Sequence, residues 1–370
     1  MTTYKRLGDY IREVNVRNRE LMVTNLLGVS ISKEFMPSIA NTIGTDMSTY
    51  KIVERGQFAY GPVTSRNGDK VSIALLDGYD DAIISQAYTV FEVIDHEQLL
   101  PEYLMMWFRR PEFDRYARFH SHGSAREIFD WDELCDVMLP IPSITRQREI
   151  VAEYETLTNR IRLNNQMIQH LEATAQTLYR KTFVDNIDKE NLPEGWRMGK
   201  IEEFCIIMTG KKDVNESLNE GKYRFFSCSP DLFYSNEYIA KGPAVLVAGN
   251  GSYTGRVTYY DKEFDLYQRT YACIPKEFAL ELMPFFYCVL KFEFQGKFLG
   301  GSRGSSIPYI VRGDIADFEF VYNQDSIILF SVEVGKILSH IQLILKENDK
   351  LTELKSLLLA KMGRENNKVL

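Results

Sequence analysis

Two long segments of this chain carry the same coiled-coil pattern. Apolar residues recur at alternating spacings of four and three in residues 144–183, and again in residues 325–362. A shift of 180 residues superposes Leu171 on Leu351 in the same heptad phase. A helix of about 40 residues is about 60 Å long, and it cannot fold alone on so narrow an apolar stripe. The simplest fold is therefore an antiparallel pair of helices formed within one chain.

Each predicted helix carries an asparagine in its apolar seam. Asn164 lies in the first helix and Asn348 in the second. A buried amide opposite a leucine would lack a hydrogen-bond partner, so we predict the register that places Asn164 against Asn348. In the alternative fold, each helix packs only on the globular domain that precedes it.

The segment before each long helix has a different residue composition from the helix itself. Gly, Pro, Tyr and Phe concentrate there, and turn signals such as Asn67-Gly68 and Asn250-Gly251 separate short β-type runs. These runs predict strands at 51–53, 71–76, 88–94, 244–248, 256–260 and 270–274, and shorter helical stretches at 101–119 and 280–298. The predicted fold class is α+β, with two globular domains separated by two long helices that form an antiparallel coiled coil. The expected order is domain 1–143, helix 144–184, linker 185–192, domain 193–324, helix 325–362 and tail 363–370.

Composition restricts the function classes. The 370 residues carry a net charge of −7, and neither half is basic, so charge alone gives no support to nucleic-acid binding. Five cysteines without CxxC spacing and a single HxH pair, His120 and His122, predict neither a disulfide framework nor a metal site. We find no signal peptide and no apolar run of the roughly 18–20 residues that a membrane span needs. We therefore expect a cytoplasmic protein with no membrane contact.

Familiar catalytic motifs are missing from the sequence. It contains no GxxxxGK[ST] phosphate loop, no HExxH or GxSxG motif, and neither of the Asn-Pro-Pro-aromatic and Asp-Pro-Pro-Tyr motifs of amino methyltransferases. Gly249-Asn250-Gly251 follows an apolar run, but strand-like residues come next, where a nucleotide-binding loop needs a helix N-terminus. We predict a β-turn there and no catalytic residues. A nuclease or methyltransferase half with a degenerate cofactor site at this turn is a competing hypothesis.

Basic and small polar residues gather at equivalent places before each long helix. Arginines alternate with aromatic residues over 107–119, and loops containing Gly, Ser and one Arg follow at 121–128 and 300–307. The duplication distinguishes these loops from common Gly/Ser turns, and such residues suit close approach to phosphates and bases. With residues from nearby turns, the predicted DNA-binding set is Arg66, Asn67, Lys70, Arg118, Ser124, Arg126, Asn250, Tyr253, Arg256, Arg269, Ser302, Arg303, Ser305 and Ser306.

Several segments resemble the specificity subunits of type I restriction-modification systems. Residues 139–151 are similar to the family's entry to its long helix, residues 171–183 to the end of that helix, and Leu192-Pro193-Glu194-Gly195-Trp196 to the opening of a target-recognition domain. Residues 56–60 and 242–248 resemble a family strand, and residues 123–126 resemble its GSxR/Q loop. Together with the 180-residue repeat, the resemblance covers nearly the whole chain.

The resemblance implies a DNA-recognition role. Each globular domain would be a target-recognition domain that reads one half of a split target in double-stranded DNA. The two helices would set the unread gap and dock two methyltransferase subunits, which bind S-adenosylmethionine and methylate adenine. In some systems restriction subunits that use ATP and Mg would join. The chain itself would bind no cofactor and catalyse nothing. The alternative is a coiled-coil scaffold that binds proteins without reading DNA.

Overall fold

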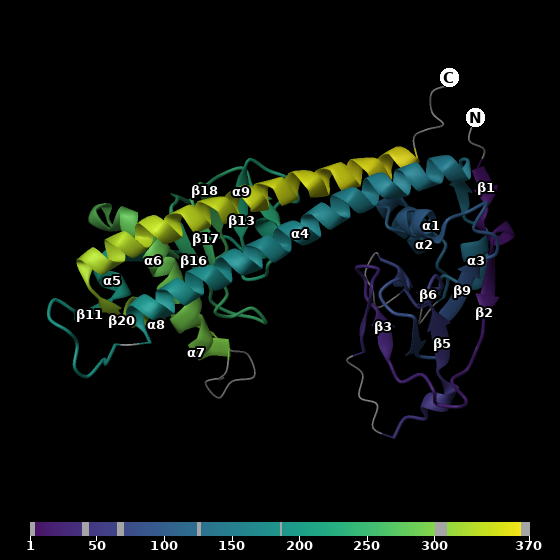
Figure 1. The fold of residues 1–370 in the computed structure, drawn as a ribbon. Helices are drawn as coiled ribbons and strands as arrows, with labels where there is room; N and C mark the ends of the chain where they lie inside the picture. The colour runs from purple at the N-terminus through teal and green to yellow at the C-terminus, as the bar shows by residue number, and fades with distance from the viewer. Residues whose placement is uncertain are drawn as a thin grey trace. The chain divides into compact units, whose positions relative to one another are not determined.

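The structure is a computed structural model that describes residues 4–38, 44–64, 70–123, 127–185, 187–299 and 309–363 (Figure 1). Its contacts divide the chain into two compact units. Unit 1 comprises Met1–Arg162 and Asn348–Leu370, and unit 2 comprises Leu163–Glu347. Each unit therefore combines one globular domain with a part of both long helices.

Both predicted long helices are confirmed. Helix α4 spans Ile144–Phe183 and helix α9 spans Gln324–Met362, each within one residue of the expected range. Helix α9 begins directly after Asn323, whose side-chain oxygen accepts the backbone N–H of Ser326 at 3.0 Å. Such an acceptor satisfies one of the free N–H groups in the first turn, which explains why the helix begins there.

The two helices run antiparallel within each unit. In unit 2, the late α4 residues Tyr179 and Phe183 pack on the early α9 residue Phe330, with ring centroids 6.0 and 5.2 Å away. In unit 1, the early α4 residue Tyr154 lies beneath the late α9 residue Lys355, whose Nζ is 4.7 Å from the ring centroid. The helices therefore pack on each other as well as on the domains, as the heptad pattern predicts.

The seam asparagine of α4 is buried, as its heptad position predicts. The Asn164 side-chain Nδ2 donates a hydrogen bond to Oε2 of Glu347 at 3.0 Å, within unit 2. Glu347 directly precedes Asn348 on α9, and Asn348 is counted with unit 1. The pairing of Asn164 with Asn348 itself stays a prediction.

Unit 1 is built on an antiparallel four-stranded sheet. Its order is β2 (Ile11–Val14), β9 (Thr89–Val93), β6 (Phe58–Tyr60) and β7 (Ile73–Leu75). The remaining elements are the strand pairs β1 (Tyr4–Arg6) with β10 (Met138–Pro140), β3 (Leu27–Val29) with β4 (Phe35–Pro37), and β5 (Lys51–Glu54) with β8 (Asp81–Ile84), and the helices α1 (Pro101–Phe108), α2 (Pro111–Phe119) and α3 (Trp131–Cys135). The short 3-10 turns are Leu7–Asp9 and Met47–Thr49.

Unit 2 contains two four-stranded sheets. One has the order β12 (Cys205–Thr209), β19 (Thr270–Pro275), β16 (Ala244–Ala248) and β17 (Val257–Tyr260). The other has the order β14 (Phe233–Ser235), β13 (Tyr223–Phe226), β18 (Glu263–Leu266) and β15 (Ala240–Lys241). Strand β11 (Arg197–Lys200) pairs with β20 (Glu319–Tyr322), and the helices are α5 (Ile201–Phe204), α6 (Met283–Cys288), the π-helix η5 (Val289–Phe294), α7 (Gln295–Leu299) and α8 (Arg312–Ala316). The 3-10 turns are Val214–Glu216 and Glu277–Leu282.

The sequence repeat recurs in the topology of the two units. The sheets β2-β9-β6-β7 and β12-β19-β16-β17 have corresponding strand orders and are antiparallel throughout. In each unit a five-residue helix, α3 or α8, leads into a short strand, β10 or β20, that precedes the long helix. The duplication therefore extends from the long helices to the globular domains, as the similar composition and order of the segments before each helix indicated.

All six predicted strand regions contain strands, but the two shorter helical stretches are interrupted. The first divides into α1 and α2, because Pro111 follows Arg110, which has an extended backbone, and begins a new helix. The second contains the π-helix η5 between α6 and α7. Hydrophobic periodicity alone identified the stretches but did not reveal either interruption.

Helix α9 is apolar over much of its length, although Glu333 and Lys336 interrupt its apolar residues. By length and composition alone, this helix is long and apolar enough to cross a membrane, although the core helix of a soluble protein passes the same test. The reason is that α9 is apolar on two faces. Ile327, Val334 and Ile341 are buried in unit 2, whereas Leu329 and Leu343 are exposed.

The start of α4 is fixed to unit 1 by one buried amide. The Gln147 side chain is fully buried. Its Nε2 donates to the carbonyls of Gln98 and Pro142 at 2.8 and 2.9 Å, and its Oε1 accepts the N–H of Leu100 at 2.9 Å. Both amide N–H groups and the amide oxygen of Gln147 are hydrogen-bonded, so this residue fastens the start of α4 to the chain around residues 98–100.

Replacement of Gln147 by leucine should destabilise unit 1. The change leaves the Leu100 N–H and two carbonyls without their partners, which costs about 2–4 kcal/mol. Urea unfolding of the full chain, followed by hydrogen exchange of unit 1 amides, measures the loss. Gln176→Leu, at an exposed position of the same helix, is the matched control. Equal stability of the two variants would contradict this role of Gln147.

Candidate nucleic-acid interface

Three segments of unit 2 meet at one edge of its first sheet. The N–H of Gly249 donates to the carbonyl of Arg269 at 2.9 Å, and the N–H of Ile310 donates to the carbonyl of Gly249 at 2.8 Å. Asn250 also forms an isolated β-bridge with Tyr309. Backbone hydrogen bonds therefore join three segments: the turn after β16, the turn before β19, and the segment that follows residues 300–308.

Glycines make this junction possible. A Cβ on Gly249 would lie 2.5 Å from the Arg269 carbonyl oxygen and 2.7 Å from the Tyr271 ring. Gly251 and Gly255 have φ angles of +80° and +85°, which favour glycine. Strand β17 follows, so the prediction of a turn between strands at Gly249-Asn250-Gly251 is confirmed.

Arg256 ties a fourth segment to the same edge. Its Nη2 donates to the carbonyl of Ser229 at 2.6 Å, and Ser229 in turn donates its hydroxyl to Asp231 at 2.8 Å. Burial lowers the pKa of Arg256. Its Nε is buried without a hydrogen-bond partner among the residues that the structure describes. Arg256 therefore holds loops together and keeps one donor unused.

The exposed groups at this edge are suited to contact a polyanion. Arg269 and Tyr253 are exposed, and Asn250 is partly exposed. Lys211 is also exposed, and it was not predicted as a site residue. Its neighbour Lys212 accepts the N–H of Gln268 at its carbonyl, which brings Lys211 close to Arg269 in the chain fold. A lysine in a loop gives no sequence signal until the fold places it.

Unit 1 brings together its own two predicted loops. The N–H of Thr64 donates to the carbonyl of Glu127 at 3.0 Å, and the Thr64 hydroxyl donates to that of Ser121 at 3.0 Å. Arg118 forms an ion pair with Glu127 at 2.7 Å, so much of its charge is compensated. Lys70 is exposed where the chain resumes after residues 65–69.

Eight predicted site residues lie outside the described part of the chain. They are Arg66, Asn67, Ser124, Arg126, Ser302, Arg303, Ser305 and Ser306. Their flanking residues are placed at the two junctions described above. The DNA-binding role of the whole set stays a prediction.

The basic, aromatic-rich stretch 107–119 does not form one phosphate-binding face. Trp107 and Phe113 are buried in the core of unit 1. The Arg110 guanidinium stacks 4.1 Å from the Trp107 ring and lies 3.5 Å from Glu112. Phe119 is 80% exposed, and its ring centroid lies 5.2 Å from that of His120.

The five cysteines are free thiols and all are buried, as the sequence predicts. Burial raises the pKa of Cys205 to about 12. Over the described ranges, no group of three or more His, Cys, Asp or Glu side chains is arranged to hold a metal ion.

The fold is that of a duplicated α+β protein with one long helix in each repeat. Residues 193–356 match the family model of the type I restriction modification DNA specificity domain. The EcoDI type I restriction enzyme specificity subunit of Escherichia coli is 38% identical over 126 residues, which are 34% of this chain and 27% of that one. The HindI specificity subunit of Haemophilus influenzae is 24% identical over 186 residues, 48% of this chain and 40% of the relative.

The chain thus spans well under half the length of the curated relatives it matches. A solved S subunit of a type I restriction-modification system from M. genitalium has the same fold, with a TM-score of 0.58, 16% identity, and coverage of 97% of this chain and 95% of that one. The resemblance to specificity subunits of type I systems is confirmed, and it is carried in the second half by the match of residues 193–356 to the DNA specificity domain model.

Proposed function

We propose that this chain is the DNA sequence-recognition subunit of a type I restriction-modification complex. Each unit reads one half of a bipartite target in double-stranded DNA, and the complex acts in the cytoplasm. The observation that carries the proposal is the duplicated junction of loops, each placed before a long helix in a chain related to specificity subunits. Two similar but diverged sites suit two different half-sites.

An exposed apolar stripe on α9 supports docking of partner subunits. Leu329, Val332 and Leu343 are 71%, 56% and 67% exposed, and their spacing puts them on one helix face. Exposed large apolar side chains that share one helix face are typical of interaction sites. We assign this stripe to methyltransferase subunits, two per chain, with restriction subunits as further partners.

The chemistry belongs to those partners in this proposal. S-adenosylmethionine would bind to the methyltransferase subunits, and ATP with Mg to the restriction subunits. The net charge of −7 suits this arrangement, because partners would supply much of the positive charge that holds the phosphates. A coiled-coil scaffold that binds only proteins is the alternative, and it leaves the two loop junctions without a role.

Co-purification with the cognate methyltransferase subunit tests the proposal. The chain alone should methylate no DNA, and the complex should methylate adenine. Combined Leu329→Gln, Val332→Gln and Leu343→Gln changes should weaken assembly at least tenfold, because three apolar contacts are lost. Glu333→Gln with Glu353→Gln, at exposed positions beside the stripe, is the control. Methylation by the chain alone, or no effect of the triple change, would contradict the proposal.

A further inference from the structure

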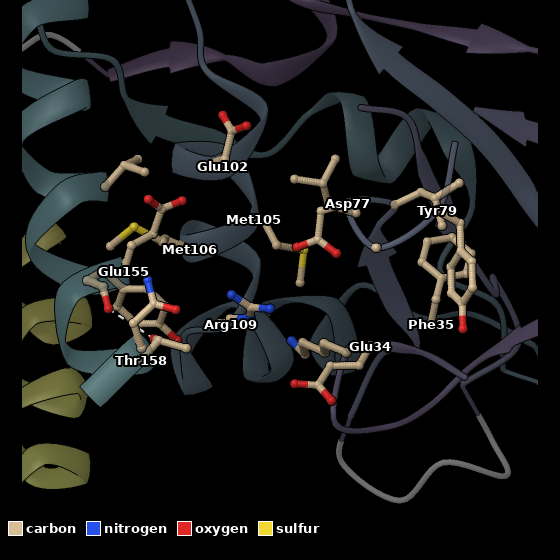
Figure 2. Close-up of a pocket in the computed structure, with 17 residues that line it drawn as sticks. Glu34, Phe35, Asp77, Tyr79, Glu102, Met105, Met106, Arg109, Glu155 and Thr158 are labelled. Carbon is tan, nitrogen blue, oxygen red and sulfur yellow. Dashed lines mark hydrogen bonds between the residues drawn. The ribbon is translucent and has the colours of Figure 1, made fainter. Parts of the chain in front are cut away.

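Two surfaces of unit 1 offer different charge to a polyanion. A pocket of about 530 Å³ lies on the side of α1 and α4. Four exposed carboxylates line it, those of Glu34, Asp77, Glu102 and Glu155 (Figure 2). Carboxylates repel phosphates, so this side does not suit DNA. The loop junction at the end of α2 carries two histidines, His120 and His122, which the function proposed above does not use.

Both imidazoles lie against one carboxylate of α3. The Nδ1 of His120 is 3.0 Å from Oε2 of Glu133, and the Nε2 of His122 is 3.5 Å from Oε1 of the same residue. The side chain of Asp130 accepts the backbone N–H of Glu133 at 2.9 Å, which fixes the turn of α3 that presents this carboxylate. We call His120, His122 and Glu133 the His–Glu cluster.

The backbone holds the two histidines at the loop junction. The N–H of His122 donates to the carbonyl of Ile128 at 3.0 Å, and the N–H of Ile128 donates back at 2.9 Å. His120 ends α2, and its ring stacks on Tyr116 with a centroid distance of 4.2 Å. The side chains of His120 and His122 are 33% and 73% exposed, so a ligand in solution reaches both rings.

Protonation reverses the charge of the His–Glu cluster. Histidine is the side chain that ordinarily gains or loses its charge between about pH 5 and 8. With both imidazoles neutral, Glu133 leaves the cluster with one negative charge. With both imidazoles protonated, the cluster carries one positive charge and presents N–H donors to an anion.

Fixed charges beside the cluster are paired or acidic. Two arginine–carboxylate pairs, each at 2.7 Å, are Arg118 with Glu127 and Arg6 with Asp136. Asp130 and Asp132 flank the start of α3 and, like the C-terminal end of α2, favour protonated imidazoles. Burial raises the pKa of Tyr116, so the phenol that stacks on His120 stays neutral. The protons of the two histidines therefore decide the sign of the charge at this place.

We propose that His120 and His122 contact the DNA backbone in their protonated form and make DNA binding by unit 1 depend on pH. The inference rests on the proposed function, since it concerns the same loop junction. DNA phosphates favour protonated imidazoles, so the bound state holds more protons than the free chain. Affinity is therefore highest at low pH and falls as the pH rises through the range in which the imidazoles lose their protons.

Unit 2 lacks this dependence on pH at its own loop junction. Residues 193–324 contain no histidine, and the exposed cations there are Arg269 and Lys211. Arginine and lysine keep their charge between pH 6 and 8. The two junctions therefore differ in how their charge is supplied, and only that of unit 1 takes up protons when DNA binds.

Fluorescence anisotropy at pH 6 and pH 8 tests the inference. The sample is the full chain in complex with the cognate methyltransferase subunit, and the probe is a labelled duplex with the bipartite motif found by methylation sequencing. We expect the drop in affinity from pH 6 to pH 8 to be about tenfold larger for the wild-type chain than for His120→Gln with His122→Gln. At pH 6 the wild-type salt slope should exceed that of the double variant by about one.

A fixed charge and a matched control complete the experiment. His122→Lys should bind more tightly than the wild-type chain at pH 8 and lose most of the pH dependence, and its exposed position keeps the test valid if the double variant fails to fold. His96→Gln, at an exposed histidine beside Glu92 and Asp95, should keep the wild-type profile.

The outcomes separate this inference from the proposed function. If the complex binds the duplex and the double variant keeps the wild-type pH profile, the histidine contact is overturned while DNA recognition stands. If the complex does not bind the duplex at either pH, DNA recognition itself is overturned, and the histidine contact with it.

Discussion

Replacement of Arg269 by alanine should impair recognition of one half-site and leave the other intact. The Arg269 side chain is exposed at the loop junction of unit 2, whereas its backbone carbonyl supports the fold and is retained in the variant. Loss of a bidentate contact to guanine weakens binding by about 1–3 kcal/mol at that base pair. Affinity measured on DNA altered in each half-site separately reveals which half depends on Arg269.

The salt dependence identifies the kind of contact. A base contact leaves the slope of affinity against salt unchanged, whereas a lost phosphate contact lowers it by about one and weakens all sequences alike. Lys262→Ala is the control, because it removes one exposed charge at the opposite end of β17. If both variants weaken binding equally on every sequence, the loop junction does not read DNA.

Insertion of one heptad into both long helices should lengthen the unread gap of the target. The insertions are placed between Arg162 and Leu163 and between Glu347 and Asn348, where the chain passes from one unit to the other. Packing inside each unit is then preserved. Each helix gains about 10 Å, which corresponds to about three base pairs of DNA. Adenine-methylation sequencing of cells that carry the variant shows the preferred gap.

A one-sided insertion is the matched control for this experiment. A heptad added to α4 alone leaves α9 too short to keep its contacts in both units, so methylation should fall without a defined new gap. The double insertion is expected to keep both half-sites, because the domains are untouched. Intact methylation with an unchanged gap would mean that the helices do not set the spacing.

The long helices were predictable because their stability depends on a periodic apolar stripe. The heptad steps placed α4 and α9 within one residue, and the asparagine in the seam of α4 is buried. The strands were also found, since β16 is a short apolar run that is buried throughout. Its successive residues, such as Val245 and Leu246, point to opposite faces of the sheet and enter two different cores of unit 2.

Tertiary contacts decided what the sequence did not reveal. Arginines 109 and 110 look alike in the basic stretch, yet one lines a pocket and the other stacks on Trp107. Arg256 was predicted to bind DNA, but in the structure its Nη2 donates a hydrogen bond to the carbonyl of Ser229. The Arg256 contact joins residues 27 apart in the sequence, so no local pattern encodes it.

Domain exchange with methylation sequencing tests the central claim most directly. Cells would carry this chain, or a version with residues 193–324 replaced by the corresponding domain of another specificity subunit, together with the methyltransferase subunit. We expect methylated adenines in one bipartite motif, and exchange should alter one half of that motif while the other half and the gap stay the same. A motif that is unchanged by the exchange, or that changes in both halves, would contradict the claim that each unit reads its own half-site.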